Sequence, residues 1–211
     1  DHPITDLVLH GSLAYVATGA GPLYVVDVSN SVQPHVLQRL PDVHARRLFL
    51  SGDFLYASGN PLSADRLFDI SNPSQPTLLA SYTKGSERVL ALNGPQSFSV
   101  LGYSLQVSDH TNPGSPQIVG GFAASQFIYG LALAGSRAAV LSASGLQLID
   151  FTNPAAPAAQ PVLWLGEELK DGLPAPVFAN GLLYVAGEGK LWVVDVRQTT
   201  KPSLLATVPL S

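Results

Sequence analysis

The chain has 211 residues, of which 46% are hydrophobic and only 12% are charged, so it can bury a substantial core and is not a disordered polymer. Its net charge of −4 lacks the basic excess that a phosphate backbone requires, which argues against nucleic acid as a partner. Cysteine is absent, which excludes disulfides, thiolate metal sites and cysteine nucleophiles. Methionine is absent as well, so we expect that Asp1 follows a removed signal peptide, a removed tag or an upstream domain.

The most membrane-like stretch, residues 89–108, has 20 residues without a charge. Asn93, Pro95, Gln96 and four serines interrupt it, so it predicts strands and turns and no transmembrane segment. The chain also has 19 Gly and 17 Pro, and a composition so rich in chain-reversing residues favours many short strands.

One pattern recurs five times along the chain. An aspartate ends an apolar segment, and a proline follows seven positions later in every unit. The aspartates step by 42, 40, 41 and 45 residues and are Asp27, Asp69, Asp109, Asp150 and Asp195. Five such repeats fill the whole chain, so we expect a single domain over residues 1–211.

Each unit contains four apolar segments. In the first unit they are residues 7–9, 13–17, 23–26 and 35–40, and in the fifth they are residues 177–179, 182–186, 191–194 and 203–208. A glycine marks the turn between the first two segments in each unit, at Gly11, Gly52, Gly94, Gly135 and Gly181. Segments of this length, rich in β-branched and aromatic residues and bounded by turn residues, predict four antiparallel strands per unit.

A four-stranded sheet of this size cannot bury both of its faces alone, so the units must pack face to face. Radial packing predicts an all-β fold, a five-bladed β-propeller of four-stranded antiparallel blades. The expected blades are residues 4–44, 45–86, 87–126, 127–168 and 169–211. A linear β-solenoid is the alternative, but its repeats are shorter and lack hairpin turns.

The third strand of the units carries a family resemblance. Leu23-Tyr-Val-Val-Asp-Val-Ser-Asn30 and Leu191-Trp-Val-Val-Asp-Val196 resemble the LVIVD repeat. The related sequences are Leu67-Phe-Asp-Ile-Ser-Asn-Pro73 and Leu146-Gln-Leu-Ile-Asp-Phe-Thr-Asn-Pro154. The third unit departs from the pattern with a polar Ser108, and the fifth has Arg197-Gln-Thr199 where others have Ser-Asn-Pro. The resemblance implies a propeller from a bacterial or archaeal exported or surface protein. It implies no catalytic signature.

The five equivalent aspartates could form a ligand ring or could fix turns. The third strand of a blade lies roughly 10 Å outside the innermost one, which separates aspartates of different blades too far for a shared metal ion. We therefore expect Asp27, Asp69, Asp109, Asp150 and Asp195 to accept backbone N–H bonds two residues on, as structural turn residues.

Catalytic motifs are weak throughout the sequence. No two of the five histidines lie three to five residues apart, and no Gly-x-Ser-x-Gly sequence is present. On the innermost strands only Asp6 and Glu87 are acidic, and solvated rim charges explain both. We expect no enzymatic activity, no cofactor and no metal.

Partner binding is expected on the loops that lead into each inner strand, because loops vary while strands pack. These connections hold much of the scarce charge and several aromatic residues, and an insertion at 164–172 breaks the repeat. The candidate partner-binding residues are Arg46, Arg47, Arg88, Tyr129, Trp164, Glu167, Glu168, Lys170 and Asp171.

The sequence thus favours a non-enzymatic protein-binding or scaffold module, extracellular, on the cell surface or periplasmic, and a subunit or domain of a larger assembly. The alternative is a propeller that binds a small molecule or a glycan at the opening of its central axis. A variant of this alternative also hydrolyses its ligand. A multivalent lectin would repeat the same aromatic set in every blade, whereas the two tryptophans occupy unlike positions.

Overall fold

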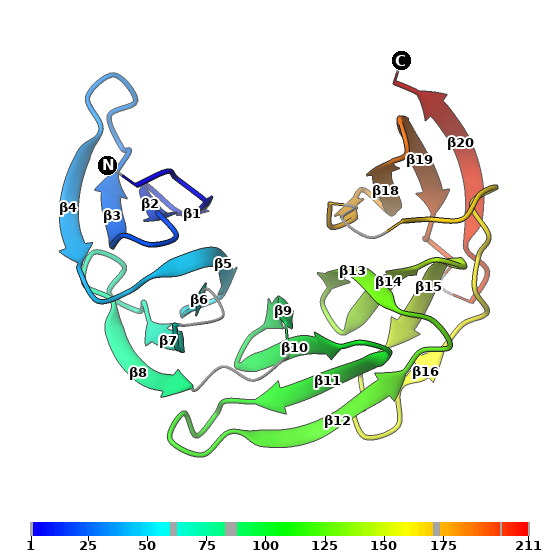
Figure 1. The fold of residues 1–211 in the computed structure, drawn as a ribbon, viewed down its shortest axis with the longest axis horizontal. Coiled ribbons are helices and arrows are strands. Elements are labelled where there is room, and N and C mark those ends of the chain that lie inside the picture. The colour runs from blue at the N-terminus through cyan, green and yellow to red at the C-terminus, as the bar shows by residue number, and fades with distance from the viewer. Residues whose placement is uncertain (1, 60–62, 83–87, 171–173, 199, 211) are drawn as a thin grey trace. The chain divides into compact units, whose positions relative to one another are not determined.

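A computed structural model of the chain describes residues 2–59, 63–82, 88–170, 174–198 and 200–210, and these contain strands and turns but no helix. Twenty strands form five four-stranded sheets, in each of which the strands pair in chain order (Figure 1). The prediction of an all-β, five-bladed propeller with antiparallel four-stranded blades is confirmed.

The first blade consists of β1 (Asp6–His10), β2 (Leu13–Ala17), β3 (Leu23–Asp27) and β4 (His35–Leu40). The second consists of β5 (Ala45–Ser51), β6 (Phe54–Gly59), β7 (Asp65–Asp69) and β8 (Thr77–Tyr82). The third consists of β9 (Arg88–Asn93), β10 (Gln96–Leu101), β11 (Ser104–Asp109) and β12 (Gln117–Ala123). The fourth consists of β13 (Ile128–Ala134), β14 (Arg137–Ser142), β15 (Gly145–Asp150) and β16 (Ala158–Ala159). The fifth consists of β17 (Val177–Ala179), β18 (Leu182–Gly187), β19 (Lys190–Asp195) and β20 (Ser203–Pro209).

The outer strand of the fourth blade, β16, is only two residues long. Pro161 ends it, because proline has no N–H to donate to a ladder. The chain stays beside the sheet nevertheless: the N–H of Gln160 donates to the carbonyl of Leu148 at 2.8 Å, and Leu163 forms an isolated bridge with Leu146.

The five aspartates share one geometry. In each blade the aspartate Oδ1 accepts a bond from the backbone N–H two residues on, at 2.7 Å from Ser29, Ser71 and Thr111, 2.8 Å from Thr152 and 2.9 Å from Arg197. A second turn follows, in which the residue three positions after each aspartate accepts an N–H bond at 3.0–3.1 Å. Hydrogen bonds from the residue two positions on, through its side chain and its backbone N–H, lower the pKa of all five carboxyls, that of Asp195 to about 2 through its bonds with Arg197.

These turns also join neighbouring blades. The carbonyl of the residue after the asparagine accepts a bond from the preceding blade in three cases: from Tyr15 Oη to Pro73 at 2.7 Å, from Tyr82 Oη to Pro113 at 3.1 Å and from Gly121 N to Pro154 at 3.1 Å. At the third of these contacts the backbones nearly touch. A Cβ on Gly120 would lie 1.8 Å from the Pro154 carbonyl oxygen, so only glycine fits there.

The turn before the second strand is left-handed in every blade. Four blades use glycine there, with φ between +54° and +60°, at Gly11, Gly52, Gly94 and Gly135. In the fifth blade the equivalent residue is Asn180, at φ +52°, and not Gly181 as its type suggested. Asparagine tolerates this region better than most side chains, and Gly181 supplies the second positive φ of the turn.

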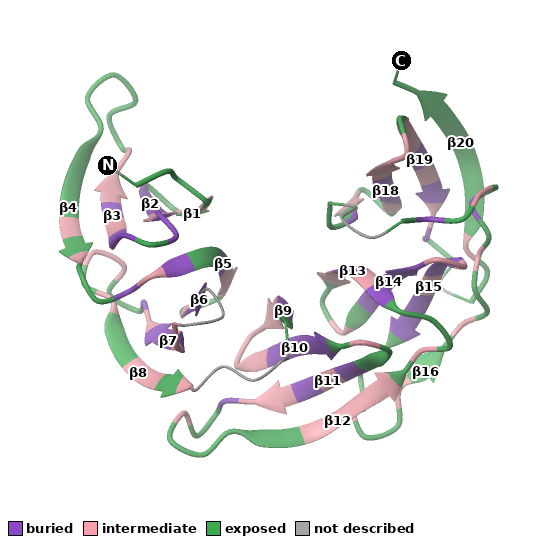
Figure 2. Ribbon diagram, in the orientation of Figure 1, coloured by how far each residue is buried: buried purple, intermediate pink, exposed green. Residues whose placement is uncertain are grey.

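The chain divides into two compact units. The first contains residues 1–87, 94–96 and 109–116, and the second contains residues 88–93, 97–108 and 117–211. In the first unit one apolar core lies between the first and second blades. In the second unit one core lies between the third and fourth blades and another between the fourth and fifth. Within the blades, β2, β6, β10 and β14 are largely buried and β18 is partly buried, whereas β20 is exposed along its whole length (Figure 2).

The terminal blades supply their own strands. β1 pairs with β2 in the first sheet, and β20 pairs with β19 in the fifth. Neither blade borrows a strand from the other end of the chain within the described residues.

We predict that Asp69→Ala and Asp150→Ala each lower the melting temperature, because each removes the acceptor that fixes a turn. Asp→Asn at the same positions keeps an acceptor oxygen and should lower it less. Since the folded-state pKa of both carboxyls is depressed, their contribution is present above about pH 4 and is lost as the pH falls further. Thermal melts followed by circular dichroism test this. Normal melting combined with lost partner binding would instead make the aspartates part of a site.

Candidate functional site

The candidate partner-binding residues are divided between the two units. Arg46 and Arg47 belong to the first unit, and Arg88, Tyr129 and the described part of the insertion belong to the second. Asp171 lies outside the described residues.

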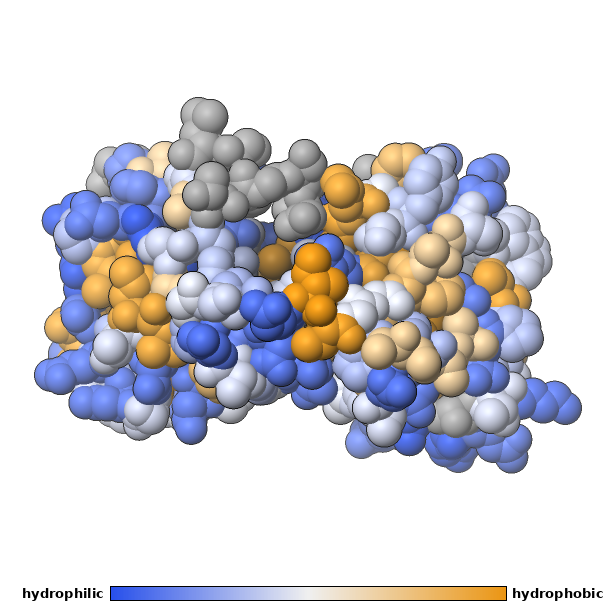
Figure 3. Space-filling view, turned by 90° about the horizontal axis from the view of Figure 1, so that it is seen from below, coloured by the Kyte–Doolittle hydropathy of each residue, from blue (hydrophilic) through white to orange (hydrophobic). Residues whose placement is uncertain are grey.

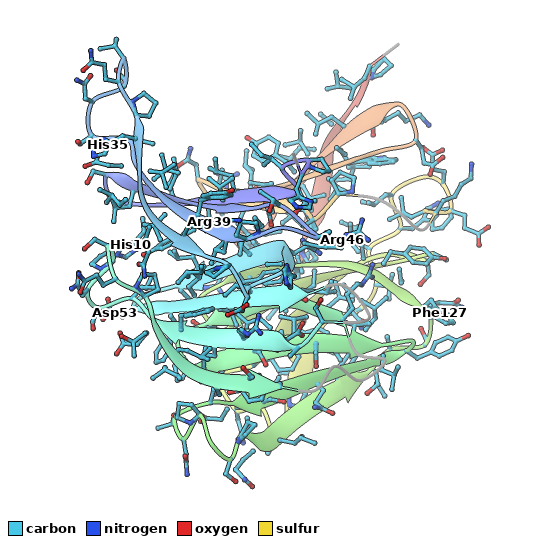
Figure 4. All side chains as sticks on the ribbon, turned by 60° about the vertical axis from the view of Figure 1, so that its left-hand side comes forward. His10, His35, Arg39, Arg46, Asp53 and Phe127 are labelled. Atoms are coloured by element: carbon cyan, nitrogen blue, oxygen red, sulfur yellow. The ribbon has the colours of Figure 1, made fainter. Side chains whose placement is uncertain are left out.

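In the first unit, Arg46 sits on a β-bulge at the start of β5. The register between β5 and β6 shifts between Ala45 and Arg47, so Arg46 has no partner residue on the adjacent strand. A bulge of this kind turns a side chain out of the regular alternation. Figure 4 shows Arg46 at the opposite end of the strands from His10, His35 and Asp53. Arg47 is exposed too, and its guanidinium lies 5.0 Å from the ring centroid of Phe49 in a cation–π contact.

In the second unit, Arg88 and Tyr129 are brought together. Arg88 begins β9, and its Nη2 donates to the backbone carbonyl of Tyr129 on β13 at 3.1 Å. The Tyr129 side chain packs against the core between the fourth and fifth blades. Arg88 therefore presents an exposed cation at the start of a strand. Tyr129 is partly buried, and its backbone carbonyl holds the Arg88 guanidinium in place.

The insertion is packed onto its unit and is not a free loop. Leu165 and Leu169 are buried in the core between the fourth and fifth blades, together with Trp192. The N–H of Leu169 donates to the carbonyl of Ala143, in the turn between β14 and β15. Because these two leucines contribute apolar burial, substituting either of them is expected to destabilise the fold as well as to change the surface of the insertion.

The polar residues of the insertion reach the turn between β18 and β19. Glu167 forms an ion pair with Lys190, and Lys170 Nζ lies 3.1 Å from Glu188 Oε2. Such exposed pairs add at most about 1 kcal/mol each. Trp164, Glu168 and Lys170 are exposed, so these three are the accessible candidates among the described residues of the insertion.

A group of exposed apolar side chains was missed by the sequence analysis. Leu101 and Tyr103 flank Gly102 in the turn between β10 and β11, and Phe127 precedes β13. The rings of Tyr103 and Phe127 lie 4.6 Å apart, centroid to centroid. The three side chains are 52%, 51% and 50% exposed respectively, and we call them the aromatic patch.

Backbone bonds hold this patch in place. The N–H of Ile128 donates to the carbonyl of Gly102 at 3.1 Å, and the N–H of Ala124 donates to that of Tyr103 at 2.8 Å. Figure 4 shows Phe127 at the end of the strands, pointing away from the sheets. The sequence signal that could have identified this patch is the presence of apolar residues at turn positions. Leu101 and Tyr103 flank a glycine in a turn, and Phe127 stands just before a strand, where no strand face can bury them.

Exposed apolar side chains outside the aromatic patch do not by themselves indicate a binding site. Ile118, for example, is 68% exposed on the outer strand β12. On the face seen in Figure 3, hydrophobic residues form small patches separated by hydrophilic ones. Single exposed apolar residues are common on soluble proteins, whereas grouped aromatic rings on a fixed turn are typical of interaction sites.

A buried polar cluster occupies the second blade. Asp65, only 5% exposed, accepts bonds from Tyr56 Oη and Ser58 Oγ, both at 3.2 Å, and from the N–H of Gly59 at 2.8 Å. Three donors satisfy the carboxylate, as a buried charge requires. The corresponding position in the first blade is Leu23, so the sequence pattern alone suggested an apolar residue here.

Two aromatic residues and a histidine continue this cluster. His110 Nδ1 lies 2.9 Å from Tyr82 Oη, and the ring of Tyr56 lies about parallel to that of Tyr82 with centroids 6.2 Å apart. The single hydroxyl proton of Tyr82 goes to the carbonyl of Pro113, so Nδ1 of His110 is the donor in their bond. Burial lowers the pKa of His110, against a smaller opposing effect of Asp109. The cluster holds the turn at 109–116 to the second blade.

No metal centre emerges from the described residues. They contain no group of three histidine, aspartate or glutamate side chains that could hold a metal ion. Asp6 accepts bonds from the N–H groups of Leu7 and Leu48, each at 2.8 Å, so its carboxylate links β1 to β5. Glu87 lies outside the described residues. Among the residues that the structure describes, no helix is long and apolar enough to cross a membrane.

Four-stranded blades that pack through apolar faces within each unit define a β-propeller. The LVIVD repeat model matches residues 4–40, 43–84 and 180–209, more than half of the chain, so the chain belongs to the LVIVD repeat family. The matched residues include the fifth blade, despite its Arg197-Gln-Thr variation, and do not include the third or fourth. No curated protein matches the chain with significance.

Solved structures with similar folds have low sequence identity. A functionally unknown protein from Desulfotomaculum acetoxidans aligns with a TM-score of 0.74 and 11% identity over 98% of this chain and 70% of its own. KlAtg21, solved in complex with the coiled coil of AgAtg16, aligns with a TM-score of 0.66 and 14% sequence identity. The alignment covers 100% of this chain and 72% of KlAtg21. PorZ, a surface component of the type-IX secretion system of Porphyromonas gingivalis, aligns with a TM-score of 0.62 and 17% sequence identity. The alignment covers 97% of this chain but only 28% of PorZ.

We predict that Leu169→Ala destabilises the protein by about 2–5 kcal/mol, because it opens a cavity in the core between the fourth and fifth blades. Glu168→Ala, one residue away and exposed, is the matched control and should change stability by no more than about 0.5 kcal/mol. Urea unfolding of both variants measures this. Equal, small effects would contradict the packed position of the insertion.

We also predict that stability falls when the pH is lowered from 7.5 to 5. The pKa of His110 in the folded protein lies below its ordinary value of 6.5, so the unfolded chain takes up the proton first. The contribution of neutral His110 is therefore full above about pH 6.5 and is lost as the pH falls through the folded pKa. His110→Gln should reduce the difference in melting temperature between the two pH values. The turn aspartates titrate at lower pH and do not contribute in this window.

Proposed function

We propose that the protein is a non-enzymatic protein-binding module, exported or on the cell surface, that acts as a subunit or domain of a larger assembly. The observation that carries this proposal is the aromatic patch of Leu101, Tyr103 and Phe127. Half-exposed apolar rings on a hydrogen-bonded turn lose little conformational entropy on binding, and they bury large areas when a partner covers them.

The positions of the charged candidates support the same proposal. Arg88 in the second unit, and Arg46 and Arg47 in the first, are exposed at the start of inner strands. Arginine and aromatic side chains dominate the binding energy of protein interfaces. Trp164, Glu167, Glu168 and Lys170 add an exposed aromatic ring and charges on the insertion.

Two of the structural relatives suit this proposal by their printed descriptions. KlAtg21 was solved with a coiled coil, and PorZ is a bacterial surface component of a secretion system. Exposed aromatic and arginine side chains on this chain would serve a comparable role as a docking surface for another protein.

We predict that Phe127→Ser or Tyr103→Ser weakens binding of the natural partner about thirtyfold or more, the effect expected when an interface anchor is truncated. Arg88→Ala, the pair Arg46→Ala and Arg47→Ala, and Trp164→Ala should also weaken it. Ile118→Ser, which changes another exposed apolar residue outside the patch, is the control. Affinity capture with quantitative mass spectrometry identifies the partner as a protein lost with Phe127→Ser and retained with Ile118→Ser. Unchanged capture by every variant of the set, with normal melting, would refute the proposal.

A further inference from the structure

The outer strand of the first blade, β4, has one free edge. It pairs with β3 on one side and is the last strand of its sheet on the other (Figure 1). Half of the backbone N–H and C=O groups of such an edge strand point away from the sheet, where no neighbouring strand bonds them. An edge strand can therefore accept a further strand from another chain.

A hollow of about 620 Å³ lies beside this edge, between the first and second blades of the first unit. Leu37 and Gln38 line it from β4, and residues 74–77 line it from the second blade. We call this hollow the edge groove. Its lining residues are uncharged and offer hydroxyl and amide groups, so the groove suits a neutral, polar occupant.

The equivalent place between the third and fourth blades is filled by peptide backbone. Gly120 and Gly121 of β12 stand eleven and twelve residues after Asp109, as Gln38 and Arg39 do after Asp27. The N–H of Gly121 donates to the carbonyl of Pro154 at 3.1 Å. The outer strand and the next turn therefore close on each other there, and the tight contact at Gly120 leaves no room for a side chain.

The same closure is missing in the first unit. The residue equivalent to Pro154 is Pro73, whose carbonyl accepts a bond from Tyr15 Oη at 2.7 Å. Within the described residues, no backbone N–H of β4 bonds to this carbonyl. The N–H of Arg39, which stands in the position of the Gly121 N–H, therefore lacks the acceptor that its equivalent has.

Gln38 is the second difference between the two places. It carries a long side chain where β12 has a glycine, and it points to the same side of the sheet as Val25, its partner on β3. Its Oε1 is buried and accepts no bond from the described residues. Buried polar atoms in proteins nearly always have a partner, because an unpaired one has lost water without compensation. Rotation of the terminal amide would bring Oε1 to a donor that enters the groove.

We propose that the edge groove binds an extended peptide segment of another protein, which pairs with the free edge of β4. A carbonyl oxygen of the peptide accepts the N–H of Arg39, as the carbonyl of Pro154 accepts that of Gly121 in the second unit. A peptide N–H donates to Gln38 Oε1. Backbone bonds give the affinity, as in other cases of strand addition, and the neutral lining favours uncharged side chains. This site lies in the first unit and is separate from the aromatic patch, which lies in the second.

The first test selects ligands from a display library of random peptides, about twelve residues long, on the immobilised full chain. The dissociation constants of the selected peptides are then measured by titration calorimetry. Gln38→Ala should weaken binding about fivefold through loss of one hydrogen bond, and Thr77→Trp, which fills the groove, at least about tenfold.

Arg39→Gln is the matched control for these variants. The Arg39 side chain follows Gln38 on β4 and therefore points to the opposite face of the sheet, so this variant should bind the peptides as the wild type does. Thermal melts show that each variant is folded. A selection in which no peptide depends on Gln38 and Thr77 would overturn the proposal.

Backbone pairing is tested on the peptide itself. Methylation of a peptide nitrogen removes one donor, and strand pairing uses only every second N–H of an added strand. Single N-methyl variants along a selected peptide should therefore weaken binding at least about tenfold at alternate positions and little at the positions between. A uniform effect, or no effect, would show that the peptide does not pair with β4.

Phe127→Ser separates this site from the proposed function. This variant should bind the groove peptides as the wild type does, because the aromatic patch belongs to the other unit. Peptides that Phe127→Ser loses and Gln38→Ala retains would be ligands of the patch. If all selected peptides behaved in this way, the edge groove would be overturned as a site while the proposed function would stand.

Discussion

The structure depends on the burial of both faces of each blade. The second and third strands of a blade alternate apolar residues to opposite sides, so a single sheet presents two apolar surfaces and can cover neither. Leu55 and Ala57 on one side of the second blade become buried only because Tyr15, Leu23 and Val25 of the first blade lie against them. Stability at one blade is therefore conditional on its neighbour, as in other repeat proteins where interfaces between units supply much of the stability.

The second blade departs from this pattern, because it buries the carboxylate of Asp65, whose desolvation is unfavourable. On one face of its sheet it has Tyr56, Ser58 and Asp65, where the equivalent positions of the first blade are Tyr15, Ala17 and Leu23. A buried carboxylate is tolerated only when donors surround it, and here a phenol, a hydroxyl and a backbone N–H do so. Such a network fixes the orientation of its members more strictly than apolar contacts do. It also introduces a dependence on pH, through His110, that the apolar cores lack.

The sequence predicted the repetitive part of the molecule well, because repetition supplies five independent observations of each position. The spacing of Asp27, Asp69 and their equivalents was enough to identify five blades and the strands within them. The sequence could not reveal where one unit departs from the rest. Asn180 replaced a glycine in a left-handed turn, Pro161 shortened an outer strand, and Leu165 and Leu169 of the insertion were buried. Asn180 and Pro161 act through local backbone chemistry that departs from the repeat, whereas the burial of Leu165 and Leu169 depends on contacts between segments that the repeat pattern does not encode.

The insertion and the aromatic patch share one physical property that matters for binding. The insertion connects the turn at Ala143 of the fourth blade, through Leu169, to Lys190 and Glu188 beside the next turn. The patch is held by bonds to Gly102 and Tyr103. Turns that are already hydrogen-bonded pay less conformational entropy when a partner covers them, so modest contact areas can give useful affinity. The strands between these turns are fixed by blade packing, and the same packing therefore determines both the stability of the fold and the rigidity of its exposed loops.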